Sequence, residues 1–177
     1  MGAAAHLADS PPSPWVARWA PLIRPGGEVL DLACGGGRHA RFLSAQGFEG
    51  LAVDRETGLF PAPPDGVTLV AADLEGEPWP FPGRRWDAIV VTNYLHRPLL
   101  PVLVDSLEPG GVLVYETFAR GNERFGKPSN PAFLLAPGEL LEAVRGRLRV
   151  VAYEDLVVGE PRPAAVQRLC ARREDAA

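Results

Sequence analysis

Short apolar runs alternate with polar, glycine-rich segments along most of the chain. Five of these runs have the length and composition of buried strands, and they span 28–33, 48–54, 67–73, 86–93 and 111–118. A helix is predicted over 13–24, because Ser13 can cap its first turn, Pro14 suits its first position, and apolar residues follow at helical spacing. Further helices are predicted over 38–46, 95–107 and 137–147.

The two ends of the pattern differ from its middle. The segments 149–158 and 165–173 read as two strands joined by the short, proline-containing GEPRPA, which predicts an antiparallel hairpin. Two connections, 55–66 and 74–85, are too rich in proline and glycine for a long helix. We therefore predict an α/β fold with a mostly parallel sheet. It forms one domain over 1–177, with a loose tail over 1–12.

Acidic residues stand where the predicted parallel strands end. Asp31 precedes the glycine-rich Cys34–Gly37, Asp54 ends the second strand and Asp73 ends the third. Ligands of open parallel sheets bind at this edge, and glycines let the backbone approach a ligand closely. Asp54 is placed to accept both hydroxyls of a ribose, and Asp73 to accept the amine of an adenine. The turn Thr92-Asn93-Tyr94 lies level with the centre of this site.

A nicotinamide-binding site is the first alternative. Gly35, Gly37 and Ala40 satisfy the dinucleotide fingerprint, with Asp54 as the ribose acid. The charge of Asp31, however, would repel a pyrophosphate and stabilise an ammonium. The terminal hairpin also replaces the second mononucleotide half of a dinucleotide-binding domain.

The set of motifs resembles the class I S-adenosylmethionine-dependent methyltransferases, in particular the small type 11/12 and tellurite-resistance enzymes. VLDLACGGGRHARFL resembles their first motif, with Ala33 in place of its first glycine. LAVDRE, AADLE, WDAIVVTNYLHR and LEPGGVLVYETF resemble the second to fifth motifs, in order. The resemblance implies a Rossmann-like doubly wound sheet of order 3-2-1-4-5-7-6, with strand 7 antiparallel and helices on both faces.

The resemblance also implies which residues bind S-adenosylmethionine and its product S-adenosylhomocysteine. The methionine end would contact Asp31, Ala33, Cys34, Gly35 and Gly37. For Asp31 the less favoured alternative is a capping residue that satisfies loop amides. The ribose would bind Asp54 beside Arg55, and the adenine would lie between Asp73 and Leu74, with Asn93 and Tyr94 near the sulfonium.

Residues on the acceptor side are less specific. Tyr94, His96 and Tyr115 are the candidate catalytic residues, although a solvated histidine and a core tyrosine are common alternatives. The long loop 119–136 is a candidate lid, with Asn122, Arg124, Phe125 and Lys127 closing over the acceptor. The alternative is a surface loop that is pinned by Phe133 and Leu134.

Composition narrows the choice of partners. The chain has 177 residues, 46% of them hydrophobic, and a net charge of −4, which disfavours nucleic acid and anionic membranes as partners. Cys34 and Cys170 form no metal-ligand spacing, and neither a leader nor a membrane span is evident, so we expect no metal site and a cytoplasmic, bacterial protein. We predict a monomeric or homodimeric methyltransferase acting on a small organic molecule, thiol or metalloid. A non-catalytic cofactor-binding regulator and a nicotinamide-dependent oxidoreductase are the alternatives.

Overall fold

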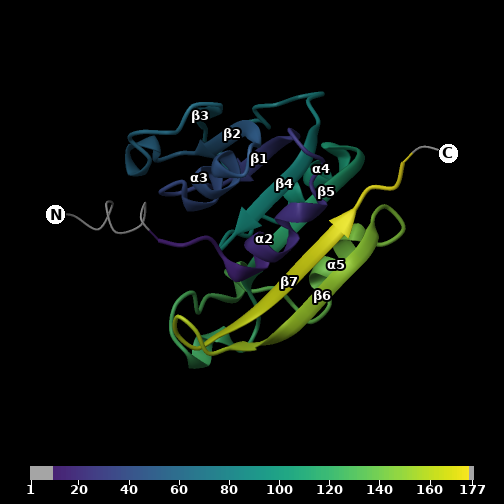
Figure 1. The fold of residues 1–177 in the computed structure, drawn as a ribbon. Helices are drawn as coiled ribbons and strands as arrows, with labels where there is room; N and C mark the ends of the chain where they lie inside the picture. Colours follow the sequence, from purple (N-terminus) through teal and green to yellow (C-terminus); the bar gives the residue numbers. More distant parts are fainter. Residues whose placement is uncertain (1–9, 176–177) are drawn as a thin grey trace.

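The computed structural model describes residues 10–175 and contains one seven-stranded sheet (Figure 1). The strand order is β3-β2-β1-β4-β5-β7-β6, and only β7 runs antiparallel to its neighbours. This confirms the predicted order. The strands are β1 Glu28–Leu32, β2 Glu49–Asp54, β3 Val67–Ala71, β4 Trp86–Thr92, β5 Leu107–Phe118, β6 Arg149–Val158 and β7 Ala164–Arg172.

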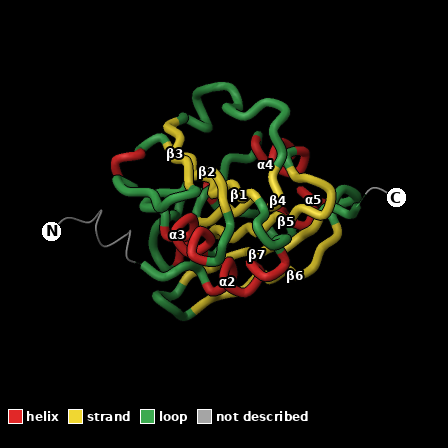
Figure 2. The backbone as a smooth tube through the Cα atoms, turned by 45° about the horizontal axis from the view of Figure 1, so that its top comes forward, coloured by secondary structure: helices red, strands yellow, loops and turns green. Residues whose placement is uncertain are grey.

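Helices cover both faces of the sheet, as predicted (Figure 2). On one face, α2 and α3 pack against Val29, Val90 and Val114. On the other face, α4 and α5 pack against the alternate positions, among them Leu30 and Ile89. The helices are α2 Pro14–Trp19, α3 Arg38–Ala45, α4 Leu99–Asp105 and α5 Glu139–Val144, and a short 3-10 turn, Ala20–Leu22, extends α2.

The connections after β2 and β3 contain no α-helix, as their proline and glycine content predicts. A single 3-10 turn, Thr57–Leu59, follows β2, and only turns follow β3. The strand order places β3 at the edge of the sheet, and none of its residues is fully buried.

Two elements begin four residues away from their predicted starts. The helix predicted over 95–107 begins only at Leu99, because Pro98 occupies its N-cap position and Arg97 turns away to bind the loop 119–136. The fifth strand begins at Leu107, before the Pro-Gly-Gly that was predicted to be a turn. There the backbone pairs with Arg173 beyond β7, through bonds between Gly110 N and Arg173 O (2.9 Å) and between Arg173 N and Gly111 O (2.8 Å).

The N-terminal helix is anchored by a buried serine. Ser13 caps α2 by accepting a hydrogen bond from Trp15 N, as predicted, and its hydroxyl donates to Glu116 Oε1 (2.7 Å). Its backbone N–H donates to His39 Nε2 (3.0 Å). Of the predicted tail, 1–9 lies outside the described residues, whereas the carbonyl of Pro11 accepts a bond from Arg38 (3.2 Å).

Candidate functional site

A cavity of about 500 Å³ lies where β1 to β4 end. Seven of the predicted cofactor-binding residues line it, namely Ala33, Asp54, Arg55, Asp73, Leu74, Asn93 and Tyr94. Ala72, Glu75 and Phe133 complete the lining. The register of the sheet explains this gathering, because the carboxyl ends of parallel strands meet at one edge.

Left-handed backbone shapes two sides of this cavity. Ala33 and Asn93 are the non-glycine residues with positive φ among those described, at 53° and 54°. Asparagine tolerates this region, whereas alanine rarely adopts it. The positive φ at this position explains why the first motif of the methyltransferases has glycine where this chain has Ala33. Strained backbone of this kind is often found at functional sites.

The glycine loop is fixed by contacts to two neighbouring segments. Gly35 N donates to Asp54 Oδ2 (2.9 Å), which joins the end of β1 to the end of β2. Gly37 is buried at the N-cap of α3, with φ 78°, and a Cβ there would lie 2.3 Å from Cε1 of Phe60. Neither glycine lines the cavity, so their backbone is positioned at its border.

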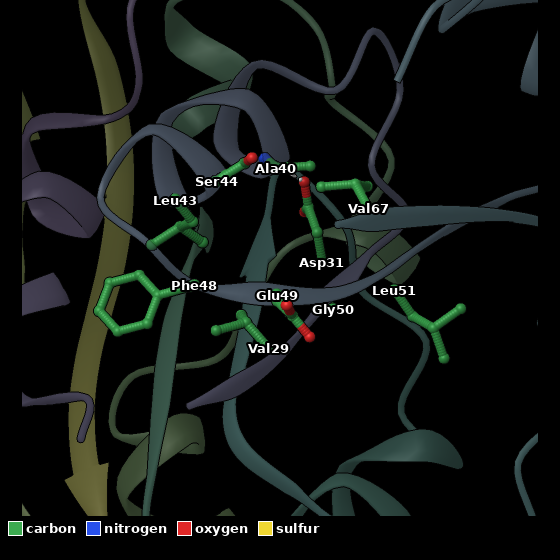
Figure 3. A pocket seen from close by; sticks show the side chains of 10 residues that line it. All are labelled: Val29, Asp31, Ala40, Leu43, Ser44, Phe48, Glu49, Gly50, Leu51 and Val67. Carbon is green, nitrogen blue, oxygen red and sulfur yellow. Dashed lines mark hydrogen bonds between the residues drawn. The ribbon is translucent and has the colours of Figure 1, made fainter. Parts of the chain in front are cut away.

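Asp31 points away from the cavity and toward α3. Its side chain lies in a narrow crevice between β2 and α3 and accepts a hydrogen bond from Ala40 N at 3.0 Å (Figure 3). Burial raises the pKa of this carboxyl from 3.8 to about 7. The structure therefore shows the capping role of Asp31, while its contact with the methionine end stays a prediction.

Cys34 lies in a small apolar cluster with Ala40, Ala52 and Phe60. Burial, with the nearby Asp31 and Asp54 carboxylates, raises the pKa of its thiol, so the side chain stays neutral. Only the backbone of Cys34 remains for ligand contact.

The strand-end acids also hold their own turns. Asp54 Oδ1 accepts a hydrogen bond from Glu56 N (2.9 Å), and Asp73 Oδ1 accepts from Glu75 N (3.0 Å) and Gly76 N (3.1 Å). These backbone bonds lower the pKa of Asp73, which keeps it ionised. Among residues 10–175, Asp73 Oδ2 accepts no hydrogen bond, so it is free to accept one from a ligand.

Two further cavities extend from the first, past Asn93 and Phe133. One, of about 260 Å³, is lined by Glu75, Tyr94 and Thr117 among others, and the next, of about 560 Å³, by Phe118 and the loop 127–130. Asn93 and Phe133 line all three.

The three candidate catalytic residues occupy different places. Tyr94 lines the cavity, and its buried hydroxyl has no hydrogen-bond partner among the described residues. Burial, with the neighbouring Glu75 carboxylate, raises its pKa. Tyr115 is in the core, where its hydroxyl donates to the Tyr94 carbonyl (2.8 Å), so it positions the Tyr94 backbone. His96 lines none of these cavities.

Two residues at the junction of the cavities were not predicted. Glu75 is the last residue of the third motif, and its turn is held by the bonds that Asp73 accepts from the backbone of Glu75 and Gly76. Phe133 was assigned a pinning role, yet its side chain is 50% exposed and lines the cavities, whereas Leu134 is buried. In the sequence, the only indication of this role of Phe133 was an aromatic residue within a long loop.

The loop 119–136 is tied down at several points. Arg97 donates to the carbonyls of Ala132 (2.7 Å) and Leu134 (3.0 Å) and pairs with Glu139. The side chain of Asn122 is buried on the inner side of this loop, so it does not face the acceptor side as predicted. Of the other predicted lid residues, Lys127 lines a cavity, while Arg124 and Phe125 stack on each other and line none of the three.

Comparisons with known proteins agree on one fold. Residues 4–132 match the model of a methyltransferase domain family. An S-adenosylmethionine-dependent methyltransferase from Mesorhizobium loti has a TM-score of 0.73 and 18% identity, over 94% of this chain and 100% of that one. TehB from Haemophilus influenzae has a TM-score of 0.70 and 20% identity, over 90% of this chain and 61% of its own length.

A third solved structure carries ligands. The 1,6-didemethyltoxoflavin-N1-methyltransferase of Burkholderia thailandensis, with bound 1,6-didemethyltoxoflavin and S-adenosylhomocysteine, has a TM-score of 0.64 and 21% identity, over 92% of this chain and 77% of that one. No curated protein matches the chain in sequence. No helix among the described residues has the length and apolar character needed to cross a membrane. Family match and sheet order together establish that the chain belongs to the methyltransferase domain family, as an enzyme of the class I, S-adenosylmethionine-dependent kind.

Proposed function

We propose that the enzyme transfers a methyl group to a small-molecule acceptor bound in the cavities beyond Asn93. The observation that carries this proposal is the series of three adjoining cavities, of which the first is lined by the motif acids and the others by Phe118 and the loop 127–130. Their volumes suit small molecules. That all seven strands belong to one sheet supports a single domain over 1–177.

The residues that line the first cavity fit the cofactor in shape and charge. Asp54 would hold the ribose, Asp73 would accept from the adenine amine through its free Oδ2, and Leu74 would pack on the base. Arg55 would lie beside the adenine. The positive-φ backbone of Ala33 and Asn93 leaves room at the centre of the site. Asp31, Cys34, Gly35 and Gly37 would contribute through the loop backbone and its charge.

S-adenosylmethionine, when bound, supplies a methyl group on a positively charged sulfur. The chain can then act largely by holding the acceptor in line and by excluding water, which is worth roughly 7–11 kcal/mol in favourable cases. Phe133 covers the junction of the cavities and would limit access of water. The raised pKa of Tyr94 keeps its phenol protonated, so the Glu75 carboxylate beside it would take the proton from an acceptor that must lose one.

Calorimetric titration with S-adenosylhomocysteine tests the cofactor site. We expect Asp54→Ala to bind at least tenfold more weakly than the wild type, because it loses both the ribose acceptor and the bond to Gly35. Asp65→Ala removes an equal charge from an exposed position after the same strand and should bind normally. Equal binding by the wild type and Asp54→Ala would contradict the assignment, and turnover of any acceptor would exclude a purely regulatory role.

A further inference from the structure

The chain separates negative from positive charge along its row of cavities. The cofactor cavity is lined by three carboxylates, Asp54, Asp73 and Glu75, and one cation, Arg55. The distal cavity is lined by two cations, Lys127 and Arg162, and by no acid. Such a distribution suits a positively charged cofactor at one end and a negatively charged group at the other.

The two distal cations are available to a ligand. Among residues 10–175, neither Lys127 nor Arg162 forms an ion pair or a side-chain hydrogen bond with the protein. Two other arginines of the loop region are paired within the protein: Arg97 with Glu139, and Arg168 with Glu116 and Glu154. Lys127 is also the only lysine of the chain.

A buried amide holds together the two segments that carry these cations. Asn122 is 2% exposed, and its Nδ2 donates to the carbonyl of Pro128 (2.9 Å), next to Lys127. Its Oδ1 accepts from Ala165 N (3.1 Å), at the start of the strand that follows Arg162. The loop 119–136 and the β6–β7 turn are thereby fixed side by side, which makes the pair of cations a built feature of the fold.

The remaining lining of the distal cavity is largely apolar. Phe118, Pro128 and Phe133 form this part, and the amide of Asn130 caps the turn beneath it by accepting from Ala132 N (3.0 Å). An inorganic oxyanion would fill little of about 560 Å³ and would leave these side chains without a partner. A molecule with both a charged group and an apolar body uses the whole cavity.

We propose that the methyl acceptor is a small organic carboxylate, recognised by Lys127 and Arg162. Its carboxylate binds between the two cations, its apolar body packs on Phe118 and Phe133, and its reacting atom lies toward Asn93. Charge-assisted bonds of this kind are the strongest that a small site offers. The inference rests on the proposed function, because it assigns the substrate class of the same site.

Ligand-observed NMR on the full chain with S-adenosylhomocysteine present tests this proposal. The probes are benzoate, cinnamate and salicylate, each compared with its neutral primary amide. We expect the carboxylates to bind at least tenfold more tightly than the amides. Lys127→Met and Arg162→Met should each weaken carboxylate binding by about tenfold and leave amide binding unchanged.

A matched control removes two positive charges far from the cavities. Arg145→Met/Arg149→Met changes two exposed arginines in and near α5 and β6 and should bind the carboxylates like the wild type. The proposal is overturned if none of the carboxylates binds, if the amides bind equally well, or if sulfate binds as tightly. Normal carboxylate binding by the Lys127→Met/Arg162→Met double variant would also overturn it. Calorimetry with S-adenosylhomocysteine separates the two levels: intact cofactor binding confines such a failure to the acceptor, whereas its loss in the wild type removes the proposed function itself.

Discussion

Replacing Gly37 with alanine would strain the glycine loop in two separate ways. The residue has φ 78°, a conformation that costs an L-amino acid about 1–2 kcal/mol. The added Cβ would also lie 2.3–2.5 Å from three atoms of the Phe60 ring. Phe60 is fully buried and its outer face is covered by the Arg41 guanidinium, 4.6 Å from the ring centroid, so the ring has little room to move.

Overpacking of this kind costs about 1–3 kcal/mol, so we expect Gly37→Ala to lower the free energy of unfolding by about 2–5 kcal/mol in total. Gly47→Ala is the matched control, because Gly47 has φ 88° but nothing within 4 Å of its missing Cβ. It should lose only the conformational part, about 1–2 kcal/mol. The excess in Gly37→Ala then measures the contact with Phe60.

Urea unfolding followed by tryptophan fluorescence gives both values. In a double-mutant cycle with Phe60→Leu, the two changes should be non-additive by about 1 kcal/mol or more, since a smaller side chain relieves the overlap. If Gly37→Ala costs no more than Gly47→Ala, or if the cycle is additive, the contact with Phe60 does not require glycine at this position.

Three further predictions concern buried polar groups. The folded-state pKa of Asp31, about 7, lies above its ordinary 3.8, so its contribution to stability is complete below pH 3.8 and is lost as the pH rises through about 7. Urea unfolding should show the wild type losing stability relative to Asp31→Asn over this window, and parallel pH profiles would contradict the burial argument. Burial lowers the pKa of His39 from 6.5 to about 3, so its contribution is complete above pH 6.5 and is lost as the pH falls through about 3. His39→Gln should lack this acid-side loss in thermal melts, and an unaltered profile would show that another group titrates. Tyr115→Phe leaves the Tyr94 carbonyl without its donor and should cost about 1–3 kcal/mol in urea unfolding and weaken cofactor binding, whereas wild-type values for both would mean that water replaces the hydroxyl.

The sheet could be predicted because its central strands are buried on both faces. Every residue of β4 except Thr92 is buried, and such a strand appears in sequence as a continuous apolar run. The boundaries that were wrong depend on contacts distant in sequence. Arg97 leaves the expected helix to bind carbonyls of the loop 119–136, and the Pro-Gly-Gly segment pairs with Arg173. The secondary-structure propensity of the local sequence gives no information on either contact.

The candidate site divides in the same way. The strand-end acids Asp54 and Asp73 could be located because parallel topology brings strand ends together. The proximity of Lys127 and Arg162 could not, because it depends on the buried side chain of Asn122 between two loops. Asp31 had two compatible roles in sequence, and only the direction of its side chain distinguishes them.

The missing helices after β2 and β3 have a consequence for local unfolding. No residue of β3 is fully buried, and the strand lies at the edge of the sheet, so its amide protons should exchange with solvent faster than those of β1 and β4. Asp73 and Leu74 follow this strand, separated from it by Ala72 alone. A ligand that binds these two residues stabilises the state in which β3 is folded by RT ln(1 + [L]/Kd), so it should slow amide hydrogen exchange in β3 most. The edge of the sheet that is least covered by the protein would thus be ordered by the molecule it binds.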